Sequence, residues 1–373
     1  MTAFHLSNRS QTNHASRREF LQACSAVAGS ALVASPTAFG DDKPKQDQPS
    51  HLVRFGHTDL YVTRYCQGTA FRQVSRSDNP EARAILHRCL DVGINFFDSA
   101  EAYGWGGSET VLGRVIRPRR DKVIICTKAA PSLKPERDPD TNEFKLGKRV
   151  AFRKQVLQRK LEGSLKRLGT DYVDLYLYHQ PDKFGTPMGQ LAEWMDALVQ
   201  AGKVRYWGVS NFTAAQVEAL YELGQASDGS HIAGTEDYYN IAARERFEPT
   251  MPPVFRRTKL GLLAFSPQDT GRLAPDREIP KDLQPLVNTL DEVAGELNAT
   301  RPQVTIAWSL SHPEVTTALG GAEKPAHVDE NFSGTKLELP DELLVKLNAA
   351  SDAYLDAKLR SGTKGDCCEA FIA

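Results

Sequence analysis

Four polar side chains of types that carry proton-transfer chemistry each follow a short, apolar segment of the sequence. The carboxyl ends of parallel strands converge on one rim of a (β/α)8 barrel, so polar residues that follow such strands are expected to meet there. The four residues come from three consecutive apolar segments, and they are Asp98, Tyr103, Lys128 and His179.

This set of residue types suits the reduction of a carbonyl group. A hydride that adds to the carbonyl carbon leaves charge on the oxygen, and a tyrosine hydroxyl with an ordinary pKa of about 10 is a weak acid for protonating it. A lysine beside Tyr103 would lower that pKa, and a shift of about three units corresponds to roughly 4 kcal/mol. Asp98 would keep Lys128 charged and oriented. His179 would hydrogen-bond the substrate oxygen.

The elements that must position these residues follow from the alternation of apolar and amphipathic segments after residue 51. Eight strand-then-helix units in order predict parallel strands, which could close into a barrel or form an open doubly wound sheet. The count of eight, and the lack of a Gly-x-Gly-x-x-Gly turn after any strand, favour an α/β fold of the closed (β/α)8 TIM barrel type. The strands are expected near 65–69, 94–97, 123–127, 173–178, 204–209, 232–236, 261–265 and 315–319.

Further segments complete the predicted barrel. Two short β-type runs around Gly56-His57-Thr58-Asp59 predict an N-terminal β-hairpin that plugs the barrel floor, and a C-terminal helix is expected after Pro340. The other helices are expected near 79–92, 107–116, 150–168, 187–201, 213–224, 243–257, 283–298, 301–311 and 324–333.

The sequence resembles the aldo-keto reductases along nearly the whole of residues 52–350. The motifs that carry the resemblance are Gly93-Ile94-Asn95-Phe96-Phe97-Asp98-Ser99-Ala100 with Tyr103-Gly104, Ser164-Leu165-Lys166-Arg167-Leu168-Gly169-Thr170-Asp171-Tyr172-Val173-Asp174-Leu175, and Gly202-Lys203-Val204-Arg205-Tyr206-Trp207-Gly208-Val209-Ser210-Asn211-Phe212. The resemblance implies that Tyr103 is the general acid, Lys128 its partner, Asp98 the anchor of the lysine and His179 the residue that orients the carbonyl.

The resemblance also implies a nicotinamide cofactor. Ser210 and Asn211 would hold the carboxamide, and Tyr239 would stack on the ring. Glu236 stands where the family usually has Gln, and the segment 323–327 replaces residues that usually bind a 2′-phosphate, so NADP is expected by family habit with NAD as the alternative. The other implied cofactor-binding residues are Gly68, Thr69, Ser266, Pro267, Gln268, Gly271, Arg272, Gly320, Lys324, His327, Glu330 and Asn331.

The expected substrate is a small molecule with a carbonyl group, an aldehyde, a ketone or an aldose, reduced to an alcohol or formed in the reverse reaction. Trp105, close to Tyr103, is a candidate wall of the substrate pocket, and the long polar loop 131–148 could cover it. An alternative function is a catalytically silent, nucleotide-binding regulatory protein on the same barrel. An unrelated metal-dependent barrel enzyme is disfavoured, because His179 alone among the histidines follows a predicted strand.

The first 40 residues have a different character from the rest. Ser16-Arg17-Arg18-Glu19-Phe20-Leu21 precedes an apolar stretch, 23–34, and the small residues of Ala38-Phe39-Gly40, which resembles a twin-arginine export signal. The alternative is a disordered tail with a chance Arg-Arg pair. The predicted organisation is a signal peptide over 1–40, a polar linker over 41–50, the barrel over 51–355 and a C-terminal tail over 356–373. The protein is therefore expected to be exported folded by the twin-arginine machinery and to act in the periplasm or elsewhere outside the cytoplasm.

The composition excludes several other classes of protein. Apolar residues make up 40% and charged residues 25% of the 373, which is typical of a soluble globular chain. The formal net charge of −1 gives no basic field for nucleic acid, and no apolar run is long enough for a stable membrane span. The six cysteines form no C-x-x-C pair, so neither a disulfide framework nor a metal site is expected.

Overall fold

The computed structural model describes residues 51–71, 79–131, 151–226 and 231–361. The predicted signal peptide and linker, most of the loop 131–148, and the end of the predicted C-terminal tail lie outside these residues, so what the sequence predicts for them stays a prediction.

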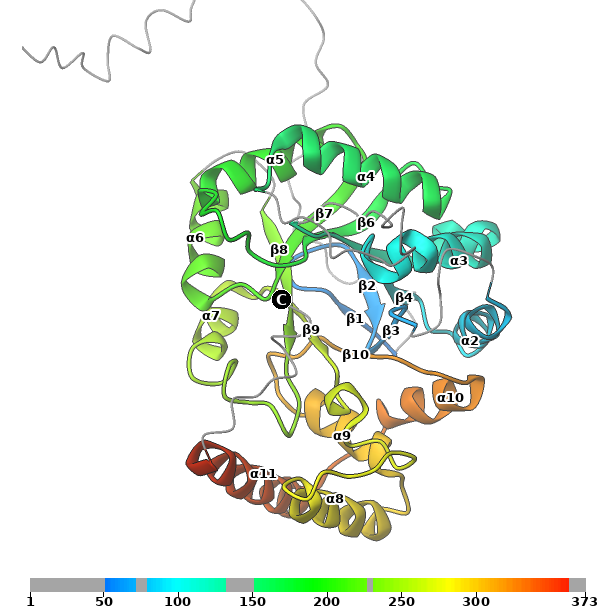
Figure 1. The fold of residues 1–373 in the computed structure, drawn as a ribbon, viewed down its shortest axis with the longest axis vertical. Helices are drawn as coiled ribbons and strands as arrows, with labels where there is room; N and C mark the ends of the chain where they lie inside the picture. Colours follow the sequence, from blue (N-terminus) through cyan, green and yellow to red (C-terminus); the bar gives the residue numbers. More distant parts are fainter. Residues whose placement is uncertain (1–50, 72–78, 132–150, 227–230, 362–373) are drawn as a thin grey trace, which may run out of the picture. The chain divides into compact units, whose positions relative to one another are not determined.

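Eight parallel strands close into a barrel at the centre of the described fold, with helices around the outside (Figure 1). This confirms the fold class predicted from the sequence. The strand order around the barrel is β10-β3-β4-β5-β6-β7-β8-β9, so each strand pairs with its neighbours in the chain and the last closes on the first. The strands are β3 (Tyr65–Gly68), β4 (Phe96–Asp98), β5 (Ile124–Ala129), β6 (Val173–Tyr178), β7 (Val204–Ser210), β8 (Ile232–Tyr238), β9 (Gly261–Phe265) and β10 (Thr317–Gly320).

The predicted hairpin closes the amino-terminal end of the barrel. Its strands, β1 (Leu52–Arg54) and β2 (Tyr61–Thr63), pair antiparallel. Phe55 is fully buried and belongs to the same apolar cluster as the side chains inside the barrel. A Cβ atom at Gly234 or Gly261 would lie within 2.7 Å of the Phe55 ring, so these two glycines make the space that the plug fills.

The helices cover the outside of the barrel, and two predicted boundaries differ most from the structure. The helix expected over 243–257 begins only at Met251, because Pro252 and Pro253 fit the first helical turn and the preceding residues form a turn closed by the Asn240–Ala243 bridge. The last helix continues to Ser361, past the predicted barrel boundary at 355. The helices are α2 (Pro80–Asp91), α3 (Gly107–Ile116), α4 (Lys154–Leu168), α5 (Met188–Gln200), α6 (Ala214–Gln225), α7 (Met251–Thr258), α8 (Gln284–Glu296), α9 (Arg301–Leu310), α10 (Pro325–Gly334) and α11 (Asp341–Ser361).

None of the described helices combines the length and the apolar composition that crossing a bilayer requires.

Candidate active site

A cleft of about 540 Å³ opens at the carboxyl ends of the barrel strands. The last residues of six strands lie in its wall, as the barrel geometry requires, and they are Gly68, Asp98, Ser210, Tyr238, Phe265 and Gly320. Its size is in the usual range for a site that encloses a cofactor or a small ligand. Tyr103 and His179 also line it, so the structure brings together three of the four residues predicted to carry the chemistry.

The fourth predicted residue, Lys128, is buried beneath the cleft floor with no exposed surface. Its Nζ atom lies 2.5 and 2.6 Å from the two carboxylate oxygens of Asp98, on the adjacent strand. It also donates to the carbonyl oxygen of Ser99 at 3.1 Å and lies 3.2 Å from the Tyr103 hydroxyl. The lysine therefore links the buried carboxylate to the phenol, which is the arrangement that carbonyl protonation needs.

Tyr103 stands at the start of the 3-10 helix η1 (Tyr103–Gly106), whose next two residues, Gly104 and Trp105, have left-handed backbone. Burial raises the pKa of Tyr103 above its ordinary value; Lys128 opposes this, and the carboxyl groups of Asp98 and Glu236 reinforce it. The sequence predicted a lowered pKa. Burial and the second carboxyl group reverse the direction, and they leave the hydroxyl protonated and able to act as an acid.

His179 follows β6 directly, and its backbone N–H donates to Ala129 at 2.9 Å. Burial, with the charges of Lys128 and Lys160, lowers its pKa from 6.5 to about 3. The imidazole is therefore neutral at physiological pH and can donate one N–H without adding a charge. Asn211 fixes the backbone here by donating from its side chain to the His179 carbonyl at 3.1 Å.

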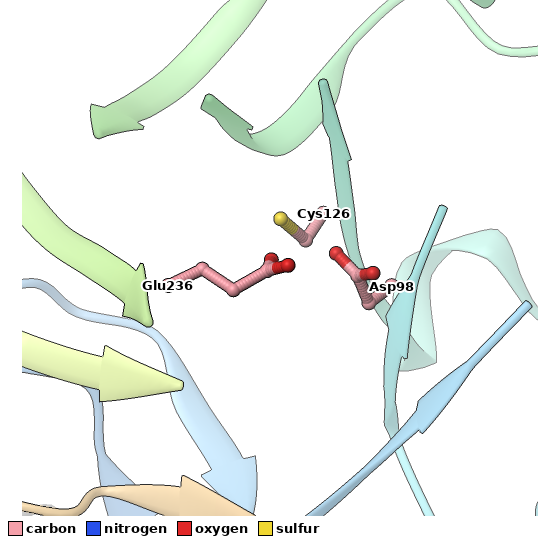
Figure 2. Close-up of side chains that lie close together, drawn as sticks. All are labelled: Asp98, Cys126 and Glu236. Carbon is pink, nitrogen blue, oxygen red and sulfur yellow. The ribbon is translucent and has the colours of Figure 1, made fainter. Parts of the chain in front are cut away.

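Glu236, from β8, is the second carboxyl group at Lys128. Its Oε2 atom lies 3.2 Å from Nζ, and its side chain is almost fully buried. Figure 2 shows the carboxyl groups of Asp98 and Glu236 and the thiol of Cys126 pointing toward one another. Carboxyl groups and thiols are ligand types that bind metal ions. Here the ammonium group of Lys128 already contacts both carboxyl groups and occupies the position that a metal ion would need.

The cleft extends from Tyr103 and His179 to the N-terminus of α10. We call the part of the cleft at α10 the nucleotide arm. Lys324 and His327 lie at that helix end, where free backbone N–H groups and the helix dipole favour anions. Gln268 donates to Asn331 at 3.1 Å, which joins the loop after β9 to α10. A site with a cationic, anion-binding arm and a proton-donating end fits a nicotinamide dinucleotide.

Most of the predicted cofactor residues line this cleft. Thr69 and Arg272 do not: Thr69 is buried against Ser99, and Arg272 pairs with Asp269. The predicted residues that line it are Gly68, Ser210, Asn211, Glu236, Ser266, Pro267, Gln268, Gly271, Gly320, Lys324, His327, Glu330 and Asn331.

Two aromatic residues of the predicted site do not line the cleft. Tyr239 is buried behind the barrel wall, donates to Glu248 at 2.8 Å and packs against Trp308, so it cannot stack on a ring in the cleft. Its neighbour Tyr238 lines the cleft. Successive strand residues face opposite sides, so the alternation that starts at Glu236 could have identified Tyr238. Trp105 is not among the residues that line the cleft.

The sequence also gave no indication of several residues around the cleft, Arg277 among them. Arg277 comes from the loop after β9, and its Nη2 atom lies 3.1 Å from both carboxylate oxygens of Glu323, which belongs to the predicted segment 323–327 after β10. The pair joins the two loops that flank the nucleotide arm. The other lining residues that were not predicted include Ala70, Phe71, Phe265, Thr270, Asp276 and Leu319.

Comparisons with known proteins agree with this geometry. The model of the aldo/keto reductase family matches residues 66–352. The chain is 30% identical over 296 residues to the methylglyoxal reductase of Escherichia coli, covering 79% of this chain and 93% of that one. It is 30% identical over 305 residues to a probable voltage-gated potassium channel subunit beta of Arabidopsis thaliana, covering 74% and 88%. Among solved structures, a thermostable aldo-keto reductase in complex with epalrestat matches with a TM-score of 0.66 at 28% identity, over 80% of this chain and 99% of that chain.

Proposed function

The chain belongs to the aldo/keto reductase family of nicotinamide-dependent oxidoreductases, and on this premise we propose that it reduces the carbonyl group of a small aldehyde, ketone or aldose with NADPH, or catalyses the reverse oxidation. The observation that carries the proposal is the contact of Lys128 with both Asp98 and Tyr103 beneath the cleft. One similar protein is named as a methylglyoxal reductase, and this name supports a small carbonyl compound as the substrate.

The residues divide the chemistry among them. Ser210, Asn211 and Tyr238 would hold a reduced nicotinamide, which would supply the hydride when bound. Tyr103 donates its hydroxyl proton to the oxygen of the substrate, and Lys128 stabilises the phenolate that is left. The neutral imidazole of His179 donates a hydrogen bond to the same oxygen without competing for the proton.

The nucleotide arm supports NADP as the cofactor, with NAD as the alternative. Lys324 and His327 offer positive or donor groups to a 2′-phosphate, whereas Glu323 is paired with Arg277 and so opposes the phosphate less than a free carboxylate would. The test is a fluorescence titration of the full chain with NADPH and NADH, in the wild type and in Lys324→Ala. We expect the wild type to bind NADPH more tightly and the variant to lose most of that preference. Equal binding of both nucleotides by the wild type would refute the choice of NADP.

A second candidate function is a nucleotide-binding regulatory subunit, and the similarity to proteins named as potassium channel beta subunits favours it. Turnover separates the two. With bound NADPH, a panel of small aldehydes, ketones and aldoses should be reduced if the chain is an enzyme. Binding of the nucleotide with no turnover across the panel would favour the regulatory function.

For localisation, we propose export of the folded protein through the twin-arginine machinery, on the basis of Arg17 and Arg18 before the apolar stretch. Folded export would carry a tightly bound nucleotide to a compartment where the free form is scarce. Fractionation of cells that express the full chain tests this: the wild type should be outside the cytoplasm, and an Arg17→Lys/Arg18→Lys variant should be retained. Retention of both would contradict export.

A further inference from the structure

The ammonium group of Lys128 has more acceptors around it than protons. An ammonium group donates three hydrogen bonds. Five oxygen atoms lie within 3.2 Å of Nζ, and they are both carboxylate oxygens of Asp98, the carbonyl oxygen of Ser99, the hydroxyl of Tyr103 and Oε2 of Glu236. Glu236 Oε2 is the one left without a hydrogen-bond partner, although it is fully enclosed.

The charges in this enclosure do not balance if both carboxyl groups are ionised. Lys128 contributes one positive charge, and Asp98 and Glu236 would contribute two negative charges. Both acidic side chains are at most 4% exposed, and an uncompensated buried charge costs several kcal/mol. Burial and the nearby Asp98 carboxylate raise the pKa of Glu236 well above its usual range. Glu236 therefore carries a proton when no further cation is present.

No other cation in the described part of the barrel faces Glu236. The thiols of Cys66 and Cys126 are neutral because burial raises their pKa, and the imidazole of His179 is neutral because burial lowers its pKa. The titratable groups that interact with Glu236 are Cys66 from β3, Asp98 from β4, Tyr103 from η1, and Cys126 and Lys128 from β5. His179, after β6, lines the same cleft.

The same carboxyl group also faces the cleft. Glu236 lies in register with Ser210 on the adjacent strand, and both line the part of the cleft where the nicotinamide is placed by the proposed function. A nicotinamide ring is neutral when reduced and carries a positive charge when oxidised. The oxidised ring would therefore be the second cation that the enclosure lacks.

Resting on that proposed function, we propose that Glu236 is a redox-linked proton carrier: it holds a proton beside the reduced nicotinamide and releases it beside the oxidised one. The glutamine that the family usually has at this position can form hydrogen bonds there, but it cannot release a proton and change its charge as Glu236 can.

The proton has a route through groups already in contact. In the reduction, the carbonyl carbon gains the hydride and the carbonyl oxygen gains the hydroxyl proton of Tyr103. A proton from Nζ of Lys128 then moves to the Tyr103 oxygen, and the carboxyl proton of Glu236 moves to Nζ. The product is an alcohol, Tyr103 and Lys128 have their starting protons, and Glu236 is a carboxylate that faces the oxidised ring. Alcohol oxidation runs through the same steps in reverse.

Calorimetric titration of the full chain at pH 7, in phosphate and in Tris, measures the protons exchanged on nucleotide binding. We expect NADP⁺ to release about one proton from the wild type and NADPH, which carries the same phosphates, to release none. Glu236→Gln should release none with either. In this variant the ratio of the NADP⁺ to the NADPH dissociation constant should rise about tenfold or more, because a favourable charge pair is lost. Asp237→Asn is the matched control, since that buried carboxyl group lies on the opposite face of β8, and it should keep the proton release.

The outcomes separate this inference from the function on which it rests. If neither nucleotide binds to the wild type, the proposed function fails and the inference fails with it. If both bind and NADP⁺ releases no proton, or Glu236→Gln matches the wild type, the inference alone is overturned. Should Glu236→Gln not fold, Glu236→Asp, which keeps a carboxyl group, should still release the proton. In the wild type the dissociation constant of NADP⁺ should also fall as pH rises toward the pKa of Glu236, while that of NADPH stays constant.

Discussion

The rings of Tyr103 and His179 meet edge to face at the cleft, with centroids 5.7 Å apart and an angle of 82° between their planes. One is a protonated phenol and the other a neutral imidazole, so two uncharged donors converge on the place where a carbonyl oxygen would bind. The buried charges of Asp98 and Lys128 lie below them. Burial keeps the phenol protonated and the imidazole neutral at pH 7.

The neutral state of His179 predicts a pH dependence of stability. The unfolded imidazole binds a proton near pH 6.5, whereas the folded one does so only at about pH 3. Between these values the unfolded chain binds more protons, so this residue lowers the free energy of unfolding by about 1.4 kcal/mol for each unit that the pH falls. Urea unfolding at pH 4.5 to 6.5 should show this slope as the difference between wild type and His179→Gln. If the free energy of unfolding changed with pH equally in the wild type and in His179→Gln, the imidazole would not be buried in its neutral form.

Asp237 is predicted to change the free energy of unfolding with pH in the direction opposite to His179, over an overlapping pH range. Burial raises its pKa from 3.8 to about 6, so the ionised carboxylate destabilises the folded state above pH 6 and has no such effect below pH 4. Asp237→Asn should therefore stabilise the protein at pH 7 by on the order of 2 kcal/mol, with the gain disappearing near pH 4. Thermal unfolding at the two pH values measures it. A variant that is equally or less stable at pH 7 would contradict the assignment.

Lys128 is predicted to be essential for stability as well as for chemistry. Lys128→Met leaves the Asp98 carboxylate buried without its partner, which should lower the free energy of unfolding by about 3–5 kcal/mol. Lys128→Met/Asp98→Asn removes both charges and should recover much of that loss, although it stays inactive. Chemical denaturation of the three proteins tests the pairing. A double variant no more stable than Lys128→Met would show that the pair is not coupled in this way.

The Arg277–Glu323 pair is predicted to slow the release of the nucleotide. Both side chains are more than a third exposed, so the pair should contribute less than about 1 kcal/mol to the stability of the free protein. Arg277→Ala should speed NADPH release about threefold to tenfold, because the two flanking loops are no longer joined. Glu323→Gln should release NADPH at a similar rate, and the double variant should release it no faster. Stopped-flow fluorescence measures the release rate of the wild type and the three variants. Additive effects would mean that the residues act separately.

The sequence allowed the barrel and its chemical centre to be predicted because both follow from strand ends. Asp98, Lys128 and His179 stand where apolar runs stop, and barrel topology brings such positions together. Tyr239 was predicted in place of Tyr238 because the two residues are adjacent and of the same type. Only the direction in which the side chains of β8 point distinguishes them.

Other features depend on contacts that spacing does not reveal. The direction of the Tyr103 pKa follows from how deeply the site is buried and from a carboxyl group 133 positions further along the chain, Glu236, neither of which an apolar pattern reports. The late start of α7 was readable in principle, because Pro252 and Pro253 mark a first helical turn.

The role of Tyr103 is tested most directly by loading the full chain with NADPH and following its oxidation by a small aldehyde in a single turnover, in wild type and Tyr103→Phe. The phenylalanine variant keeps the ring and lacks the proton, so NADPH should bind with similar affinity while the rate of oxidation falls by about two to four orders of magnitude. Oxidation at the wild-type rate in the variant would contradict Tyr103 as the proton donor.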